Sequence, residues 1–305
     1  MSYRPRHAKQ SPLKRRATTF AAGLGVVASL AAPVSAQAAP ALVLAGHTNA
    51  ITALDVTPAP LERTEGQDFF GNRTTEVVLD QPHDTLVVKV AARIAVEHGP
   101  PGDAAKTPPW EEVRAAAFAS ADLSAQSPAH FLFPSRQVSL DPDIRDYAAL
   151  SFPSGRPVLE GAIELMNRIK TEFVYEIGAT TATTTAPMSF ALRRGVCQDF
   201  THIMISGMRS LGLPVGYVSG YLRTVQKADE VRLEGADAMH AWALAWCGAE
   251  TGWIGLDPTN GILAGNDHLV LAVGRDYADV APVDGVIIAA GGHRIEVSVA
   301  VVPVG

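Results

Sequence analysis

The sequence predicts an α+β fold in which a small antiparallel β module precedes a core of helices and strands. Short alternating apolar segments separated by turn residues fill the stretch from Ala50 to His98, which is typical of antiparallel strands. At Pro157 the apolar spacing changes to three and four residues, which indicates helices, and after Pro214 strand patterns return. A helical region followed by a run of strands indicates an α+β core.

The β module is predicted to contain three strands, at residues 51–56, 75–79 and 85–96. Turn clusters lie between them. Residues 101–156 are rich in Pro, Ala and Ser and contain one helix-like stretch from Trp110 to Ala119, so they are predicted to form a linker and packing segment. The chain therefore divides into a leader (1–45), a β-rich amino-terminal module (46–100), this linker (101–156) and a core (157–305) that ends in a closing β-hairpin.

The core is predicted to begin with an amphipathic helix, because apolar residues recur at helical spacing from Leu159 to Phe173 behind Pro157. A second helix is predicted to begin at Cys197 and to end before Gly212. Five strands should follow, at residues 215–222, 239–246, 253–256, 286–289 and 294–302. The last two are expected to pair as the closing hairpin.

Charge is distributed unevenly along the chain, whose formal net charge is −6. The first 38 residues contain six Lys and Arg residues and no acid, which leaves 19 basic against 31 acidic side chains in the remainder, a balance of −12. A protein with this excess of negative charge gains no binding free energy by releasing counterions from a polyanion. Nucleic acid is therefore excluded as an expected partner. A neutral or cationic protein or peptide substrate is expected instead.

The leader has the three parts of a secretory signal peptide. Lys14-Arg15-Arg16 precedes an apolar stretch at residues 20–32, and small residues follow at 34–39. We therefore expect an exported, periplasmic protein if residues 1–38 are a genuine signal, and no stable membrane span, because the apolar stretch is short. The alternatives are an Ala-rich leader on a cytoplasmic protein, or a reading frame that omits the true first strand.

Cysteine and histidine usage limits the chemistry. Only two cysteines occur, Cys197 and Cys247, so a disulfide framework does not hold the fold together. The nine histidines include no pair at a metal-binding spacing such as HExxH, so neither a metal nor another cofactor is predicted.

Cys197 is the stronger candidate for a reactive thiol. It follows Arg193-Arg194-Gly195-Val196 at the start of a predicted helix, where unpaired N–H groups and the helix dipole stabilise an anion. The alternative is a buried structural cysteine, the commoner role of this residue type. Cys247, at the end of an apolar strand, fits that role better.

A reactive thiol needs a base, and the base needs a group that orients it. His240 lies on the predicted strand at 239–246, where a polar ring among apolar neighbours requires a partner. Asp257 ends the next strand, which a short turn at 248–252 connects to the first. Adjacent antiparallel strands would bring these two side chains within hydrogen-bonding distance.

Four segments around these residues resemble the core signature of bacterial transglutaminase-like proteins: Gly195-Val-Cys-Gln-Asp-Phe-Thr-His202, Gly216-Tyr-Val-Ser-Gly-Tyr221, His240-Ala-Trp242 and Gly252-Trp-Ile-Gly-Leu-Asp-Pro-Thr-Asn260. The resemblance extends to residues 68–73, which are similar to the β-rich amino-terminal module of that family, and to residues 274–283, which are similar to its closing segment. It covers roughly residues 50 to 305.

The resemblance implies a papain-like α+β core, that of the cysteine proteinases and transglutaminases, with Cys197 as nucleophile, His240 as base and Asp257 as its orienting partner. It also implies a thioester intermediate that water or an amine resolves, which makes the protein a peptidase, an amidase or a transglutaminase. Hydrolysis is the preferred prediction, because water is always present. The alternative is a catalytically inactive binding module that keeps this fold.

Four further residues are weaker candidates for supporting roles. Asp199 and His202 follow Cys197 on the same predicted helix and are expected to be structural or to support the catalytic residues. Tyr221 and Trp242 are candidates to line the acyl site, although aromatic residues on strands more often belong to the core.

Overall fold

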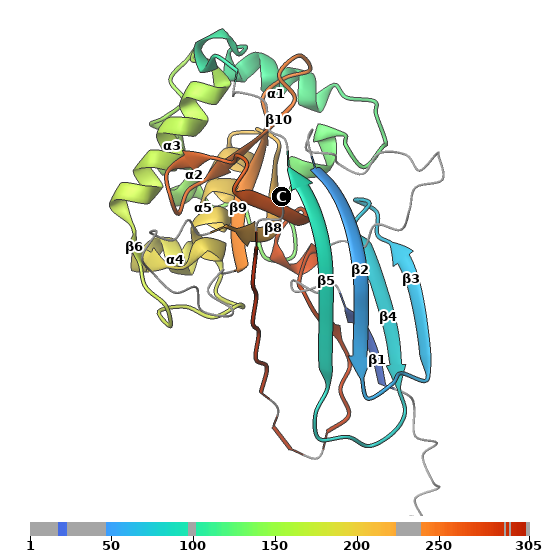
Figure 1. Cartoon of the computed structure of the whole chain (residues 1–305). Helices are drawn as coiled ribbons and strands as arrows, with labels where there is room; N and C mark the ends of the chain where they lie inside the picture. The colour runs from blue at the N-terminus through green and yellow to red at the C-terminus, as the bar shows by residue number, and fades with distance from the viewer. Residues whose placement is uncertain are drawn as a thin grey trace, which may run out of the picture.

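The computed structural model describes residues 18–22, 47–96, 102–223, 239–289, 291–292 and 294–302. A β-rich amino-terminal module lies beside a core that consists of helices and a sheet of its own (Figure 1). In the described part of the chain, no helix combines the length and the apolar character needed to cross a bilayer.

The module consists of two antiparallel sheets. Strands β2 (His47–Thr57) and β5 (Val87–Val96) form one. The other has the order β13-β1-β4-β3 and contains β1 (Thr18–Ala22), β3 (Glu62–Gln67), β4 (Arg73–Leu79) and β13 (Asp284–Gly285). The three predicted strands are confirmed. Strand β3 was not predicted because its sequence ERTEGQ has no apolar residue, and all of its residues are exposed.

One loop of the module docks on the core sheet. Asn72 donates from its side chain to the carbonyl of Val273 at 2.7 Å and accepts from the Val273 N–H at 2.8 Å. Phe70 is buried beside Phe131, with ring centroids 5.4 Å apart. The segment at 68–73, which resembles the family module, therefore anchors the module to strand β12 (His268–Gly274) of the core.

The core sheet has the order β11-β10-β9-β8-β12 and is antiparallel throughout. Its strands are β8 (Val215–Leu222), β9 (Met239–Trp246), β10 (Trp253–Asp257), β11 (Ile262–Leu263) and β12 (His268–Gly274). The predictions for β8, β9 and β10 are confirmed. Strand β12 was not predicted.

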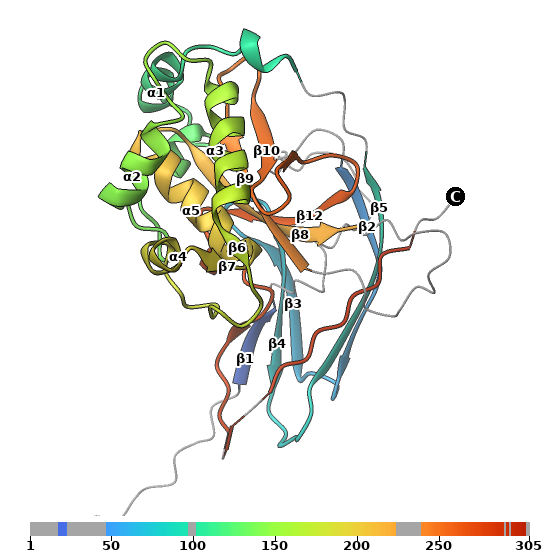
Figure 2. The same ribbon diagram turned by 90° about the vertical axis from the view of Figure 1, so that its left-hand side faces the viewer.

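Helices cover one face of this sheet (Figure 2). They are α3 (Val158–Glu172), α4 (Ala186–Leu192) and α5 (Cys197–Ser210), of which α3 and α5 were predicted. Three alanines of β9, Ala241, Ala243 and Ala245, belong to the hydrophobic cluster that includes the buried side chains of α5. Such small side chains allow α5 to approach the strand closely. The side chains of Trp242 and Leu244, which alternate with these alanines along β9, belong to a second hydrophobic cluster.

The segment predicted as a linker, 101–156, is part of the folded core. It contains α1 (Trp110–Phe118) and α2 (Pro142–Ala149). Ile144 and Ala148 of α2 are fully buried, and a Cβ at Gly207 of α5 would lie 2.8 Å from the Ala148 side chain. The start of α2 follows an ordinary signal, because Asp141 accepts hydrogen bonds from the N–H groups of residues 143 and 144 ahead of a first-turn proline.

The predicted closing hairpin is wrong. Residues 286–289 and 294–302 form no strands, and the exposed side chains in the second segment include Ile295 and Val297. Val299 and Val301 pack instead against the side chains of Tyr221 and Leu269. An alternating pattern defines one apolar face. Here that face packs on side chains of the core sheet, although the segment is not a strand.

Most of the predicted leader, residues 1–17 and 23–45, lies outside the described residues. The described part is β1, which pairs with β4 on one side and with β13 on the other. Cleavage within 34–39 would remove β1 and separate β13 from the rest of its sheet. Export by signal cleavage and this four-stranded sheet therefore exclude each other, and the expected export stays a prediction.

Candidate active site

Cys197 is the first residue of α5 and is partly buried. Asp199 caps this helix, because its Oδ2 accepts from the Val196 N–H at 2.8 Å and from the Thr180 hydroxyl at 2.6 Å. Burial raises the pKa of Asp199, although these two hydrogen bonds oppose the increase. A Cβ at Gly195 would lie 2.6 Å from Oδ2, so only glycine fits where the cap approaches the chain. Asp199 thus fixes the segment that presents Cys197.

His240 and Asp257 meet as the strand pattern predicted. His240 lies near the start of β9 and Asp257 ends β10, its antiparallel neighbour. His240 Nε2 lies 2.8 Å from Asp257 Oδ2. His240 is 9% exposed and Asp257 is fully buried, so the pair is largely shielded from water.

Five donors surround the Asp257 carboxylate. Oδ2 lies 2.8 Å from His240 Nε2, 3.2 Å from His268 Nε2 and 2.7 Å from Asn260 Nδ2. Oδ1 accepts from the backbone N–H groups of Thr259 at 2.9 Å and Asn260 at 3.1 Å. Burial alone would raise the pKa of Asp257, but the hydrogen bonds outweigh it and hold the pKa well below its usual range. The carboxylate is therefore ionised at neutral pH.

His240 connects Asp257 to Cys197. Because Nε2 faces Asp257, the other ring nitrogen, Nδ1, is left for the sulfur. Burial lowers the pKa of His240, but hydrogen bonds to Asp257 and Cys197 and the charges of both groups raise it to about 9. At neutral pH the ring is then an imidazolium, whose positive charge lies beside Cys197.

The stability of the protein should depend on this charge. The pKa of His240 rises from 6.5 to about 9 on folding, so its stabilising contribution is complete below pH 6.5 and is lost as the pH rises through about 9. We expect the free energy of unfolding to fall by on the order of 1–3 kcal/mol across this interval. Urea unfolding at a series of pH values measures it. An identical decrease in His240→Gln would contradict the assignment to this ring.

His268, which the sequence analysis did not single out, completes the cluster. Its Nδ1 accepts from the Gly265 N–H at 3.2 Å, so the proton of the neutral ring is on Nε2, which faces Asp257. His240, Asp257 and His268 each offer one atom that could bind a metal ion, and these three atoms lie within 4.8 Å of one another. A metal ion, however, would bind through the lone pair of His268 Nε2, so the ring proton would have to lie on Nδ1. There it would face the Gly265 N–H, and two N–H groups would point at each other. The hydrogen bonds therefore fit an all-protein cluster better than a metal site.

Tyr175 is a second residue that the sequence analysis missed. It belongs to the two-residue strand β6 (Val174–Tyr175), which pairs with β7 (Arg194–Gly195) just before Cys197. Its side chain is about half exposed. Burial raises its pKa, and the charge of Cys197 raises it further. Tyr175 pairs with Gly195, two residues before Cys197. A two-residue strand has no periodicity by which to recognise it.

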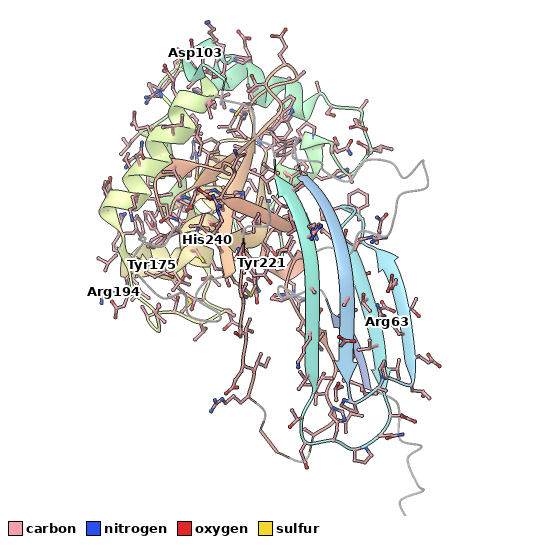
Figure 3. All side chains as sticks on the ribbon, in the orientation of Figure 1. Arg63, Asp103, Tyr175, Arg194, Tyr221 and His240 are labelled. Carbon is pink, nitrogen blue, oxygen red and sulfur yellow. The ribbon has the colours of Figure 1, made fainter. Side chains whose placement is uncertain are left out.

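The remaining candidates do not contact this cluster through hydrogen bonds. His202 is fully buried, accepts from the Tyr277 N–H at 3.2 Å through Nε2, and has its pKa lowered to about 4, chiefly by burial. Tyr221 packs with Leu269 in the cluster that faces the β module. In the view of Figure 3, Tyr221 and Tyr175 lie on opposite sides of His240.

Trp242 is also fully buried, and its Nε1 has no hydrogen-bond partner in the part of the chain that the structure describes. Its ring lies edge-on to the His268 ring, with centroids 5.1 Å apart, and 6.2 Å from the His240 ring. It therefore packs behind the two histidines and presents no surface to solvent.

Comparisons with known proteins cover most of the chain. Residues 149–258 match the model of the transglutaminase-like superfamily, and residues 46–95 match that of the bacterial transglutaminase-like N-terminal region. An uncharacterized protein of Mycobacterium tuberculosis is 38% identical over 257 residues, which cover 82% of this chain and 80% of that protein. One of Mycobacterium leprae is 44% identical over 109 residues, which cover 35% of this chain and 37% of that protein.

One solved structure shares the fold. It is described as "a Putative Cysteine Protease from Cytophaga hutchinsonii" and aligns with a TM-score of 0.63 at 23% identity. The alignment covers 88% of this chain and 80% of that protein, so both the β module and the core have counterparts there.

Proposed function

This chain belongs to the transglutaminase-like family, and we propose that it is a cysteine-dependent acyl-transfer enzyme that acts on amide or peptide carbonyls. The observation that supports the proposal most directly is the His240–Asp257 hydrogen bond of 2.8 Å, in a cluster whose histidine also bonds Cys197. This is the geometry that an activated thiol requires: nucleophile, base and a group that orients the base. Cys197 is the nucleophile, His240 the base and Asp257 the orienting residue.

In the first half-reaction the Cys197 sulfur attacks the carbonyl carbon and forms a C–S bond, while the carbonyl π electrons move onto oxygen. As the C–N bond then breaks, the proton on His240 moves to the departing amine. The acyl group stays on the enzyme as a thioester. Asp257 remains ionised and keeps Nε2 of the ring occupied, so that Nδ1 handles the proton.

In the second half-reaction an acceptor attacks the thioester carbonyl and passes a proton to His240, and the C–S bond breaks to return the thiolate. Water as acceptor gives a carboxylic acid, and an amine gives a new amide. We favour hydrolysis, because water is always present at high concentration. The same residues serve both outcomes.

Two parallel assays test the proposal. One measures cleavage of a peptide library, and the other measures incorporation of a fluorescent amine into a glutamine-containing protein. Cleavage without incorporation supports the hydrolase, and incorporation without cleavage assigns the transglutaminase. If both are absent and iodoacetamide alkylates Cys197 no faster than an unperturbed thiol, the acyl-transfer proposal fails and the inactive binding module replaces it.

Stabilising the oxyanion requires two donors, and Tyr175, which pairs with Gly195 two residues before Cys197, is the side-chain candidate beside the Cys197 N–H. We expect Tyr175→Phe to lower kcat by roughly 100-fold, the usual cost of one oxyanion donor, with little change in KM. Steady-state kinetics on the best peptide measures it. Tyr221→Phe is the matched control, because its hydroxyl is buried and has no hydrogen-bond partner among the described residues. Equal kcat values in the two variants would remove Tyr175 from the mechanism.

A further inference from the structure

The Asp257 carboxylate is held by a histidine from the far edge of the sheet. In the order β11-β10-β9-β8-β12, strands β9 and β8 separate β10, which carries Asp257, from β12, which begins at His268. The His268 ring nevertheless lies 3.2 Å from Asp257 Oδ2 through Nε2. His240 reaches the same oxygen from β9. Two imidazoles from different strands therefore share one carboxylate oxygen.

The intervening strand makes room for this contact. Gly220 of β8 is paired with His240 on β9, and a Cβ at this position would lie 2.5 Å from the Trp242 ring. The glycine thus allows Trp242 to lie over β8, where its ring meets His268 edge-on at 5.1 Å and an interplanar angle of 79°. A larger residue at 220 would displace Trp242 and with it the surface behind His268.

The orientation of His268 is fixed on both sides. The Gly265 N–H donates to Nδ1, so Nε2 carries the proton that points to Asp257. His268 is 2% exposed, so water does not compete for this hydrogen bond. A ring with one tautomer and one packing position is suited to holding a second group in place.

We infer that His268 is a positioning residue for the proposed acyl transfer: its Nε2–H holds Asp257 Oδ2 where that oxygen accepts the Nε2–H of His240. The inference rests on the proposed function for its catalytic consequence. The hydrogen bonds with Gly265 and Asp257 place the His268 ring behind the carboxylate, so it acts on the reaction through Asp257. Without it, Asp257 would keep the hydrogen bond from Asn260 Nδ2 to Oδ2 and the backbone hydrogen bonds to Oδ1, all from the segment directly after Asp257. Oδ2 would lose the donor that approaches from β12 and could then shift away from His240.

Two substitutions separate the hydrogen bond from Gly265 and the hydrogen bond to Asp257. In His268→Asn the side-chain oxygen takes the place of Nδ1 and still accepts from Gly265, but the shorter amide does not reach Asp257. In His268→Gln the amide nitrogen takes the place of Nε2 and still donates to Asp257. We expect kcat to fall by up to about 100-fold in His268→Asn with KM unchanged, and His268→Gln to recover most of it.

His202→Gln is the matched control. His202 is likewise a fully buried histidine that accepts one backbone N–H at 3.2 Å, but it does not contact Asp257 through any hydrogen bond described here. We expect it to lower the melting temperature and to keep the kcat of the wild-type protein. Loss of kcat in this control equal to that in His268→Asn would mean that burial alone explains the effect, and the positioning role would be overturned.

A measurement without turnover separates this inference from the proposed function. The N–H proton that His240 shares with Asp257 should give a low-field resonance, identified by its loss in His240→Gln. We expect it to broaden or shift in His268→Asn and to persist in His268→Gln. An unchanged resonance in folded His268→Asn overturns the positioning role. If the resonance responds while no variant, including wild type, turns over amides, the positioning role stands and the acyl-transfer proposal fails.

Discussion

Replacing Cys197 with alanine should abolish amide turnover. The variant lacks the only atom that can form the thioester in the proposed mechanism, and loss of a covalent nucleophile costs on the order of 10⁶-fold in kcat. Alanine also fits the first turn of α5 without disturbing the Asp199 cap. Kinetics with the best peptide, beside a circular dichroism spectrum that matches wild type, measures the loss.

Cys247 provides the control thiol. It is fully buried, and burial raises its pKa to about 12, so it is protonated and inert at neutral pH. Cys247→Ala should therefore keep the wild-type kcat and lose some stability. An electrophilic peptide should add its mass once to wild type and to Cys247→Ala, and not at all to Cys197→Ala. Turnover that survives in Cys197→Ala would contradict the assigned nucleophile.

The papain-like α+β fold implied by the resemblance is confirmed, and the reason lies in local signals. Helix α5 lies where it is predicted, because the spacing of its apolar residues and the Gly and Pro residues that follow it are local signals. Strands β9 and β10 are neighbours because a short turn joins them. Nearest-neighbour pairing of this kind was enough to place His240 against Asp257. The catalytic roles themselves stay a proposal.

What the sequence did not indicate depends on contacts between distant segments. His268 follows Asp257 by 11 residues, but it reaches the carboxylate only because β12 pairs with β8, and strand order is not written in any local pattern. The same holds for Tyr175, whose position beside Cys197 comes from the parallel pairing of β6 with β7. Helix α2 was missed for a different reason: it lies in a Pro- and Ser-rich stretch, and its burial comes from packing on α5.

Asp257→Asn should reduce kcat by about 10⁴-fold, the second-largest effect we expect. An amide offers one oxygen where the carboxylate offers two, so it cannot serve the donors on both Oδ1 and Oδ2. The variant also loses the hydrogen bond to the carboxylate, which is the largest of the effects that raise the pKa of His240 to about 9, together with the charge of that carboxylate. The ring of the variant should then be neutral at neutral pH, which removes both the cation beside the sulfur and the proton for the leaving amine.

The pH dependence distinguishes this effect from simple destabilisation. In wild type the activity should fall as the pH rises through about 9, because His240 loses its proton there, whereas in Asp257→Asn this alkaline decrease should occur at a lower pH. Asp276→Asn is the matched control, because Asp276 is also fully buried and accepts backbone N–H groups, from Gln137 and Ala278. It should lose stability and keep the wild-type profile. If both variants kept an alkaline limit near pH 9, the orienting role of Asp257 would fail, since the charge of His240 would then not depend on that carboxylate.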